Sequence, residues 1–218
     1  EADLTISCLK KDYFRIICPA LARSHNKSHI LKNLTRDVKF DDVTDKFSCI
    51  GIFGPNSRKF LTTLFGNFFS KEEFPFSRGK YLKVFNVKIW FQRLSFVGEL
   101  GWEIYIPKKN TNFIFNKINK LGKKFKLTFA GMHALDILRL EKKFLHWGHD
   151  ITSENNPYEA DLSFAVNLRK SNDFIGRKAL ENIKDIEPKK KLEMFSLESN
   201  FSPGKPLLLH DEPIFHKN

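Results

Sequence analysis

The chain has 218 residues, of which 41% are hydrophobic and 28% are charged. Lys and Arg number 37 while Asp and Glu number 25, which gives a formal net charge of +12. This length and hydrophobic content are enough for a globular protein with a sizeable core, and the lack of any window of about 18 apolar residues excludes a membrane-spanning helix.

The positive charge admits nucleic acid, an acidic membrane surface or a polyanionic ligand as a partner. The basic residues occur as short, dispersed pairs and triplets, such as Lys123-Lys124 and Lys189-Lys190-Lys191, without a nucleic-acid motif. We therefore interpret them as solvated surface charges and expect neither a nucleic acid nor a membrane as a partner.

The three cysteines, Cys8, Cys18 and Cys49, are an odd number without a C-x-x-C pair. This pattern favours a reducing compartment in which the thiols are buried and structural. No signal or transit pattern opens the chain. We expect a cytoplasmic protein, or one of the mitochondrial matrix if the source is eukaryotic.

The first ninety residues are predicted to combine short strands with two helices. The expected strands are residues 3–8, 13–18, 38–43, 47–53, 81–85 and 87–91. The expected helices are residues 20–34 and 56–65, the second capped by Asn56 or Ser57.

Residues 93–107 place a carboxylate between two apolar runs. Runs 93–97 and 102–107 favour strands, and Gly98 and Gly101 bracket Glu99 in the turn between them. Glycine permits the tight backbone that such a turn needs. The turn is either a surface hairpin with a solvated Glu99 or a rigid mount that presents Glu99 to paired N–H donors of a ligand.

The remaining pattern adds helices and a few strands. A helix is expected over 111–121, a largely buried helix over 130–144, a strand over 162–168 and a helix over 174–183. Residues 186–191 read as a linker, followed by strands at 192–197 and 206–209. The irregular alternation of strands, hairpins and helices predicts an α+β fold with mixed or antiparallel sheets.

Most enzyme motifs are absent: the chain has no P-loop, no G-x-G-x-x-G, no G-x-S-x-G and no H-E-x-x-H. His25 and His29 are spaced i, i+4, but no third ligand lies nearby in the sequence, so we expect no metal site. His146 and His149 flank Trp147-Gly148 in a polar turn that either touches a ligand or is only a satisfied loop.

Three stretches together carry a resemblance. They are RLSFVGELGWEIYIP at 93–107, AGMHALDILRLEKKFLHWGHD at 130–150 and NPYEADLSFAVNLRKSNDFIGRKAL at 156–180. In this order they resemble the folate-binding aminomethyltransferase family, which includes the glycine cleavage T-protein. The likeness is closer to the C-terminal folate domain of dimethylglycine and sarcosine dehydrogenases, and it covers nearly the whole chain.

The resemblance implies a role for four residues. Glu99 matches the glutamate that binds the pterin ring, and Asp3 matches the aspartate beside folate N10, where it would orient the amine and stabilise developing positive charge. Ile17 matches an apolar wall of the pterin pocket. Arg139 matches an arginine that either reaches the folate or pairs with Asp136 at i, i+3.

Four positions depart from the family pattern. Arg15 stands where the T-protein has an aromatic residue, Pro19 where it has Asn, and Leu135 where it has Arg. Asp161 replaces a usual glycine, so a positive φ at this position would strain the backbone, although Asp tolerates it better than most residues.

The resemblance also implies the domain plan. We expect a folate-binding domain over residues 1–186, with its N-terminal part missing, and the beginning of a small β-barrel domain over 187–218. The chain opens directly in a strand pattern and ends in another, which indicates a fragment of a longer polypeptide.

The function implied by the resemblance is tetrahydrofolate-dependent transfer of a one-carbon unit. The unit comes from an oxidised methylamine of the dimethylglycine or sarcosine type, or from an aminomethyl donor, and 5,10-methylene-tetrahydrofolate is formed. Tetrahydrofolate, which can carry a polyglutamate tail, is the expected cofactor. FAD is expected only in a separate flavin domain of the same polypeptide or a partner subunit. The alternative is a non-catalytic member that resembles the regulatory subunit of pyruvate dehydrogenase phosphatase.

Overall fold

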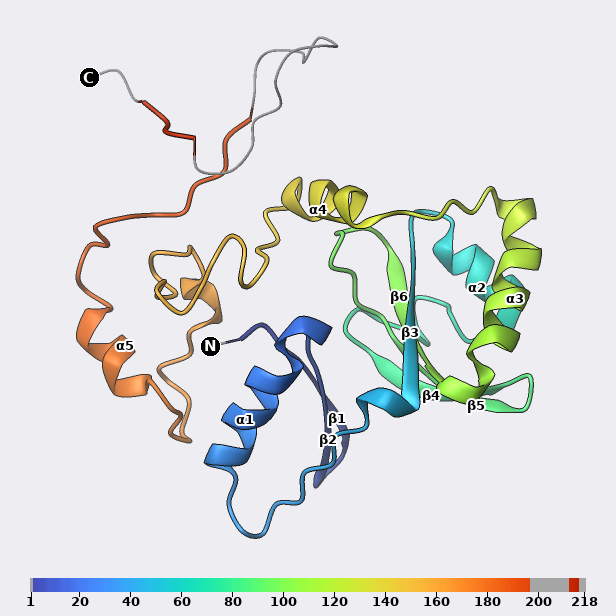
Figure 1. The fold of residues 1–218 in the computed structure, drawn as a ribbon, viewed down its shortest axis with the longest axis horizontal. Helices are drawn as coiled ribbons and strands as arrows, with labels where there is room; N and C mark the ends of the chain where they lie inside the picture. Colours follow the sequence, from blue (N-terminus) through green and yellow to red (C-terminus); the bar gives the residue numbers. More distant parts are fainter. Residues whose placement is uncertain (1, 197–211, 216–218) are drawn as a thin grey trace. The chain divides into compact units, whose positions relative to one another are not determined.

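The structure is a computed structural model that describes residues 2–196 and 212–215. The chain divides into two compact units, Glu1–Glu154 and Asn155–Asn218. Figure 1 shows the course of the chain and the labels of its helices and strands. Each unit is described by itself.

The first unit is built on a four-stranded antiparallel sheet. Its strands are β3 (Phe47–Phe53), β4 (Gly79–Val84), β5 (Val87–Gln92) and β6 (Gly101–Pro107), in the order β3-β6-β5-β4. Phe85 and Asn86 join β4 to β5, and both have positive φ values, 48° and 60°. A two-residue turn with this backbone matches the twist of the strands that it connects.

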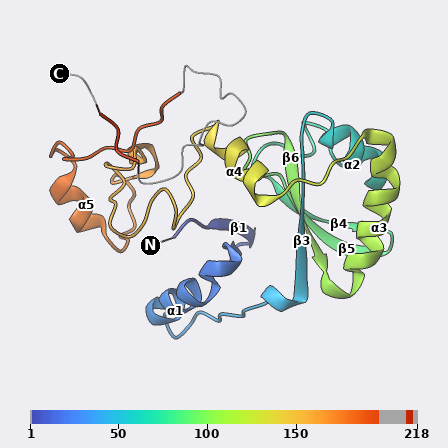
Figure 2. The same cartoon turned by 45° about the horizontal axis from the view of Figure 1, so that its top comes forward.

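Two helices cover one face of this sheet. They are α2 (Ser57–Phe65) and α3 (Thr111–Gly122), and Figures 1 and 2 show both on the same side of the strands. The buried core consists of Ile52, Phe60, Leu61, Phe65, Phe69, Phe74, Val84, Ile89, Phe91, Trp102, Ile104, Ile106, Ile114 and Ile118. At its centre the Phe69 ring lies 5.6 Å from the Trp102 ring in an edge-to-face contact. Such pairs add to the free energy of burial.

A two-stranded hairpin lies on the opposite face of the sheet. Its strands are β1 (Thr5–Lys10) and β2 (Tyr13–Ile17), paired antiparallel. Ser7 Oγ donates a hydrogen bond to Gln92 Oε1 over 3.0 Å. Because side chains alternate along β5, Ile89 and Phe91 point toward the helices while Trp90 and Gln92 point toward the hairpin.

The hairpin continues into a short 3₁₀ turn, η1 (Ala20–Ala22), and helix α1 (Arg23–Asn33). Arg23 joins α1 to the segment before β3, since its guanidinium lies 3.0 Å from the Asp42 carboxylate and 2.9 Å from that of Asp45. Hydrogen bonds from Arg23 hold the pKa of Asp42 well below its usual range. The other helical elements of this unit are η2 (Thr44–Lys46), η3 (Lys108–Asn110), η4 (Lys123–Phe125) and α4 (Met132–Leu140).

The second unit contains the 3₁₀ turn η5 (Ser163–Ala165) and the helix α5 (Arg177–Ile183) among turns. Arg177 donates to the backbone carbonyls of Leu168 and Lys170 over 2.6 and 2.5 Å. The amide of Leu192 donates to the Glu159 carbonyl over 2.8 Å. Backbone hydrogen bonds of this kind organise the described part of the unit.

The sequence patterns located most of the first unit. The hairpin, the helix over 20–34, the strand over 47–53, the β4–β5 pair and the helices of 56–65 and 111–121 are confirmed, and so is the α+β class. Asn56 occupies the N-cap position of α2, but its side chain makes no capping hydrogen bond.

Three of the strands predicted before residue 186 are wrong: residues 38–43, 93–97 and 162–168 form no strand. After β5 the chain leaves the sheet, because the amide of Leu94 donates to the carbonyl of Gln92, two residues earlier. In 162–168, amide bonds from Ala165 to Leu162 and from Val166 to Ser163 make a 3₁₀ turn. Alternation alone produced no strand in these segments, because a strand also needs a neighbour to pair with.

Other expectations also need correction. The helix predicted over 130–144 spans only Met132–Leu140, and it is mostly exposed, with Arg139 its single buried residue. Cys8 and Cys49 are exposed and Cys18 is half-buried, and all three are free thiols. Residues 192–196 form no strand, and residues 206–209 lie outside the described residues. No helix in the described ranges is long and apolar enough to cross a membrane.

Replacing Phe69 with Ala should lower the free energy of unfolding by about 3–5 kcal/mol, because Phe69 is fully buried and the change leaves a cavity. The matched control is Phe129→Ala, whose side chain is 70% exposed and which should cost less than about 1 kcal/mol. Urea denaturation of both variants measures the difference. Equal losses would show that the aromatic cluster is not the stabilising core.

Candidate functional site

The loop that carries Glu99 is longer than the tight turn that the sequence predicted. It runs over residues 93–100 and joins β5 to β6. Its far end is fixed by the Leu100 carbonyl, which accepts hydrogen bonds from the Gly54 amide (2.8 Å) and from Ser57 Oγ (2.9 Å). These two bonds attach the residue after Glu99 to the N-terminus of α2.

Close packing and burial hold the loop on both sides of Glu99. A Cβ at Gly101 would lie 2.6 Å from the Ile52 carbonyl oxygen, so only glycine fits there. Gly98 has a φ of 70°, and a Cβ there would lie 2.3 Å from Lys142 Cγ. Val97 is only 4% exposed. Glu99 is therefore presented by a backbone that has little freedom to move.

A small pocket opens beside Glu99. It has a volume of about 40 Å³ and is lined by Phe76, Arg93, Leu94, Ser95, Glu99, Leu100 and Gly101. The Ser95 hydroxyl is buried and has no hydrogen-bond partner among the described residues. Such a volume admits the polar edge of a ring, not a whole ligand. A half-buried carboxylate beside an unpaired hydroxyl fits a ligand edge that carries both donors and acceptors.

Arg139 is the buried centre of a charge cluster at the end of α4. Its side chain is 3% exposed, and its Nε lies 3.5 Å from Asp136 Oδ1. Nη1 also donates to the carboxylate of Asp150 and, over 3.2 Å, to the Phe144 carbonyl.

The i, i+3 pair of Arg139 with Asp136, one of the two alternatives that the sequence allows, is present. The pair with Asp150 was missed, because the distance between Arg139 and Asp150 depends on how the chain turns back after α4. The signal available in the sequence was the polar Trp147-Gly148-His149-Asp150 stretch itself.

The same cluster includes His146. Its amide donates to the Asp150 carboxylate over 2.8 Å, and its Nδ1 lies 3.6 Å from Asp136 Oδ1. The His146 ring lies 5.9 Å from the Phe96 ring, centroid to centroid. Together with the contact of Lys142 on Gly98, this places the loop of Glu99 against the segment that carries Arg139. The structure thus brings together the two segments that carry the predicted site residues Glu99 and Arg139.

Asp3 and Ile17 lie at the same end of the β1–β2 hairpin. Asp3 is exposed and precedes β1, and Ile17 is half-buried and pairs with Thr5 in the register of the two strands. The hairpin reaches the sheet at Gln92, and residue 93 begins the loop of Glu99. Neither side chain lines the small pocket, so the link to Glu99 runs through the hairpin and β5.

Two of the unusual positions have clear structural counterparts. Asp161 has a φ of 57°, so the position does require the left-handed backbone that glycine adopts most easily. Arg15 lies in a cluster of aromatic rings. Within residues 2–196 and 212–215, no group of three or more His, Cys, Asp or Glu side chains lies close enough to hold a metal ion.

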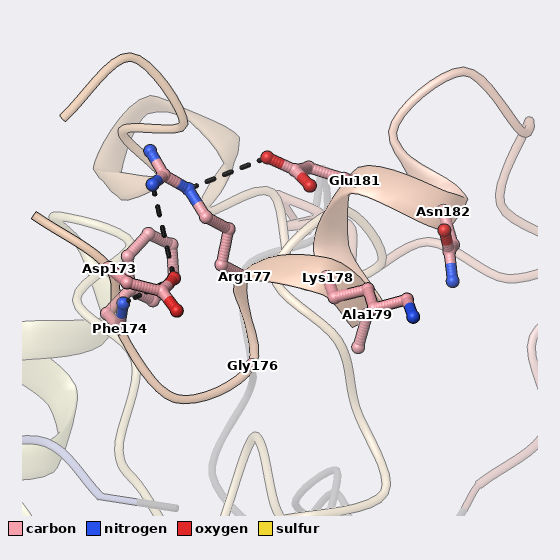
Figure 3. A pocket seen from close by; sticks show the side chains of 8 residues that line it. All are labelled: Asp173, Phe174, Gly176, Arg177, Lys178, Ala179, Glu181 and Asn182. Carbon is pink, nitrogen blue, oxygen red and sulfur yellow. Dashed lines mark hydrogen bonds and ion pairs between the residues drawn. The ribbon is translucent and has the colours of Figure 1, made fainter. Parts of the chain in front are cut away.

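A larger pocket lies in the second unit and contains none of the predicted site residues. It has a volume of about 610 Å³ and is lined by Asp173, Phe174, Gly176, Arg177, Lys178, Ala179, Glu181 and Asn182. Figure 3 shows that the Arg177 guanidinium is directed toward two carboxylates of the same pocket. Nε lies 3.5 Å from Glu181 Oε1, and Nη1 lies 4.0 Å from Asp173 Oδ1. Because this pocket contains none of the predicted site residues, we assign the candidate site to the loop of Glu99.

Comparison with known proteins identifies the family of this chain. The family model described as "GCVT N-terminal domain" matches residues 1–170. Human mitochondrial dimethylglycine dehydrogenase is 33% identical over 202 residues, which cover 91% of this chain and 23% of the human protein. An aminomethyltransferase of Listeria monocytogenes is 30% identical over 213 residues, which cover 98% of this chain and 56% of that protein.

A solved structure has the same fold. The glycine cleavage system aminomethyltransferase T from Bartonella henselae superimposes with a TM-score of 0.69, covering 85% of this chain and 49% of that one, at 23% sequence identity. The chain spans about a quarter of the length of the human dehydrogenase and about half of the bacterial aminomethyltransferase. By its family match and its relatives, this chain belongs to the GCVT N-terminal domain family, and it is related to dimethylglycine dehydrogenases and aminomethyltransferases.

Proposed function

We propose that this domain binds tetrahydrofolate and transfers a one-carbon unit to it, forming 5,10-methylene-tetrahydrofolate. The observation that supports this most directly is the rigid mount of Glu99, fixed at Leu100 and Gly101 and placed beside the unpaired Ser95 hydroxyl. Tetrahydrofolate supplies the amine nitrogens to which the carbon becomes attached.

In this proposal Glu99 recognises the pterin. The 2-amino group and N3–H of a pterin present two parallel donors, which match the two oxygens of one carboxylate. A fixed carboxylate loses little conformational entropy when it binds, which favours affinity. Ile17 would contribute an apolar wall, and Ser95 would pair with a polar edge atom of the ring.

Asp3 would act on the transferred carbon. A carboxylate next to the nucleophilic nitrogen can orient it and stabilise the positive charge that develops during transfer. The exposed position of Asp3 in front of β1 leaves its carboxylate accessible to a ligand. Arg139 is buried and shared between Asp136 and Asp150, so we propose that it supports the loop of Glu99 and reaches folate only through that loop.

The proposal also covers the one-carbon donor and the domains of the whole protein. The identity to dimethylglycine dehydrogenase favours a carbon released by oxidation of a methylamine of the dimethylglycine or sarcosine type, with FAD in a separate flavin domain. We propose residues 1–186 as the folate domain and 187–218 as the start of a small β-barrel. The net charge of +12 favours a polyglutamylated folate. The mitochondrial human relative favours the matrix if the source is eukaryotic.

The Glu99→Gln variant should bind tetrahydrofolate more weakly by about 1.5–3 kcal/mol, roughly 10- to 150-fold in Kd, because a hydrogen bond to a charged acceptor is lost. Calorimetric titration of the intact protein measures this. The control is Glu73→Gln, which removes the same charge from a side chain that is 64% exposed and pairs only with Lys80 at the surface.

An unchanged affinity in Glu99→Gln would remove Glu99 from the site. No binding of tetrahydrofolate by the folded wild-type protein would instead favour the non-catalytic, regulatory type of family member.

The Asp3→Asn variant should keep its affinity for tetrahydrofolate while its transfer rate falls by about a hundredfold or more, since the carboxylate acts on developing charge and not on pterin recognition. The rate is measured as methylene-tetrahydrofolate formed by the intact protein from dimethylglycine or sarcosine. Asp12→Asn, in the exposed turn of the same hairpin, is the control and should change neither quantity. Equal losses of affinity and rate in Asp3→Asn would indicate a structural role.

A further inference from the structure

Arg15 on β2 lies over three aromatic rings that come from three strands of the sheet. Its guanidinium carbon is 4.9 Å from the centre of the Trp90 ring, 5.3 Å from that of Tyr81 and 5.6 Å from that of Phe47. One of its nitrogens, Nη2, also donates to the Tyr81 hydroxyl. We call Arg15 and these three rings the Arg15 cluster.

The strand register explains why the rings meet at this point. Tyr81 and Trp90 are direct partners across β4 and β5, and their rings touch edge to face with centroids 5.0 Å apart. Trp90 pairs with Tyr105, which in turn pairs with Cys49, so alternation along β3 puts Phe47 on this same face. The face opposite α2 and α3 therefore carries an aromatic row, and Arg15 of the hairpin lies over all three of its rings.

The Arg15 cation depends on these rings for its stabilisation. None of the ion pairs described among residues 2–196 involves Arg15, and its buried Nη1 has no hydrogen-bond partner there. A guanidinium over the face of Trp or Tyr is attracted by the ring quadrupole, and the attraction grows as water is removed. The cluster thus stabilises the position in which the hairpin is docked on the sheet relative to one in which it is detached.

A neutral network makes the second attachment of the hairpin. Gln92 Oε1 accepts hydrogen bonds from Ser7 Oγ (3.0 Å) and from Trp90 Nε1 (3.1 Å), and Gln92 Nε2 donates to the Ser77 carbonyl (2.9 Å). Gly79 leaves the space that this network needs, since a Cβ there would lie 2.2 Å from the Trp90 ring.

The opposite face of the hairpin makes no comparable attachment. Its residues Ile6, Phe14 and Ile16 are 62%, 55% and 39% exposed. The face that carries Ser7 and Arg15 packs on the sheet, and these two side chains make its hydrogen bond to Gln92 and its cation–π contacts.

We propose that Arg15 is a positioning residue of the folate site. By docking the hairpin on the sheet, it holds Asp3 and Ile17 in a fixed relation to the loop of Glu99, which begins one residue after Gln92. The inference deepens the proposed function and rests on it for the roles of Asp3, Ile17 and Glu99. The contacts of Arg15 and Ser7, from which the docking itself is inferred, are independent of the proposed function.

The test compares two substitutions that remove a cation from the same Tyr81 ring. Lys88 Nζ lies 4.6 Å from the centre of that ring, but Lys88 belongs to β5 and joins no second element to the sheet. Arg15→Met keeps an apolar side chain of similar length and removes the charge that docks the hairpin. Lys88→Met is therefore its matched control.

Amide hydrogen exchange of the intact protein, followed by mass spectrometry, reads the docking without any ligand. In Arg15→Met, exchange should become at least severalfold faster in residues 5–17 and stay unchanged in 47–53 and 101–107, because only the hairpin is released. Lys88→Met should leave all three segments as in the wild type. The conservative variant Arg15→Lys should restore most of the protection.

Calorimetric titration with tetrahydrofolate tests whether docking of the hairpin affects the folate site. Affinity should fall by about 3- to 10-fold in Arg15→Met, by twofold or less in Arg15→Lys and not at all in Lys88→Met, consistent with the strength of a partly desolvated cation–π contact. If Arg15→Met does not fold, the same test uses Arg15→Lys. Its hairpin exchange rate and its tetrahydrofolate affinity are then compared with those of Lys88→Met and the wild type.

Three outcomes separate the possibilities. Wild-type exchange rates in residues 5–17 of Arg15→Met would overturn the docking role. Faster exchange of the hairpin with unchanged tetrahydrofolate affinity would overturn the positioning role and leave the folate site standing. Failure of the wild type to bind tetrahydrofolate would reject the proposed function and with it the positioning role, while the exchange data would still decide the docking.

Discussion

Burial of one face of β6 is the constraint on which the rest of the first unit depends. Trp102, Ile104 and Ile106 are fully buried against α2 and α3, and β6 pairs with β3 on one side and β5 on the other. Because side chains alternate, the same strand presents Glu103 and Tyr105 to the opposite face, where the hairpin docks. The close approach of Gly101 to β3 then fixes the strand's first residue, two positions after Glu99. A core that excludes water thereby also holds the functional loop, through covalent continuity and two hydrogen bonds to the Leu100 carbonyl.

Positive charges in this unit are used against aromatic rings as well as toward solvent. The guanidinium carbons of Arg58 and Arg93 lie 5.1 and 5.7 Å from the centre of the Trp102 ring, and Arg15 covers Trp90. Composition alone had assigned the basic residues to solvated surfaces, which overlooked this use. A cation on an aromatic face adds electrostatic attraction while its aliphatic stem covers apolar surface.

Arg139 is buried in the segment that packs against the loop of Glu99. It is enclosed between Asp136 and Asp150, and removing one partner of such a buried group leaves an uncompensated charge at a cost of about 3–5 kcal/mol. The segment that this pairing organises presses Lys142 and His146 against Gly98 and Phe96 of the functional loop. The arginine thus supports the backbone on which Glu99 is mounted, while the unpaired Ser95 hydroxyl leaves one polar group available to a ligand.

The sequence by itself determined the elements whose core face can be read from spacing. Residues 47–53, 57–65 and 111–122 carry apolar side chains at the periods of a strand or a helix, and these local periods survive in the structure. It also singled out Glu99, because a charge bracketed by two glycines between apolar runs is unusual. Runs 38–43, 93–97 and 162–168 have similar alternation but form no strand, since pairing requires a neighbour that local pattern cannot supply. Only the tertiary structure decided that Arg139 meets Asp150, that Ser95 stays unpaired beside Glu99, and that Arg15 covers three rings. Each of these depends on segments far apart in the chain meeting at one place, a property of packing that no local period encodes.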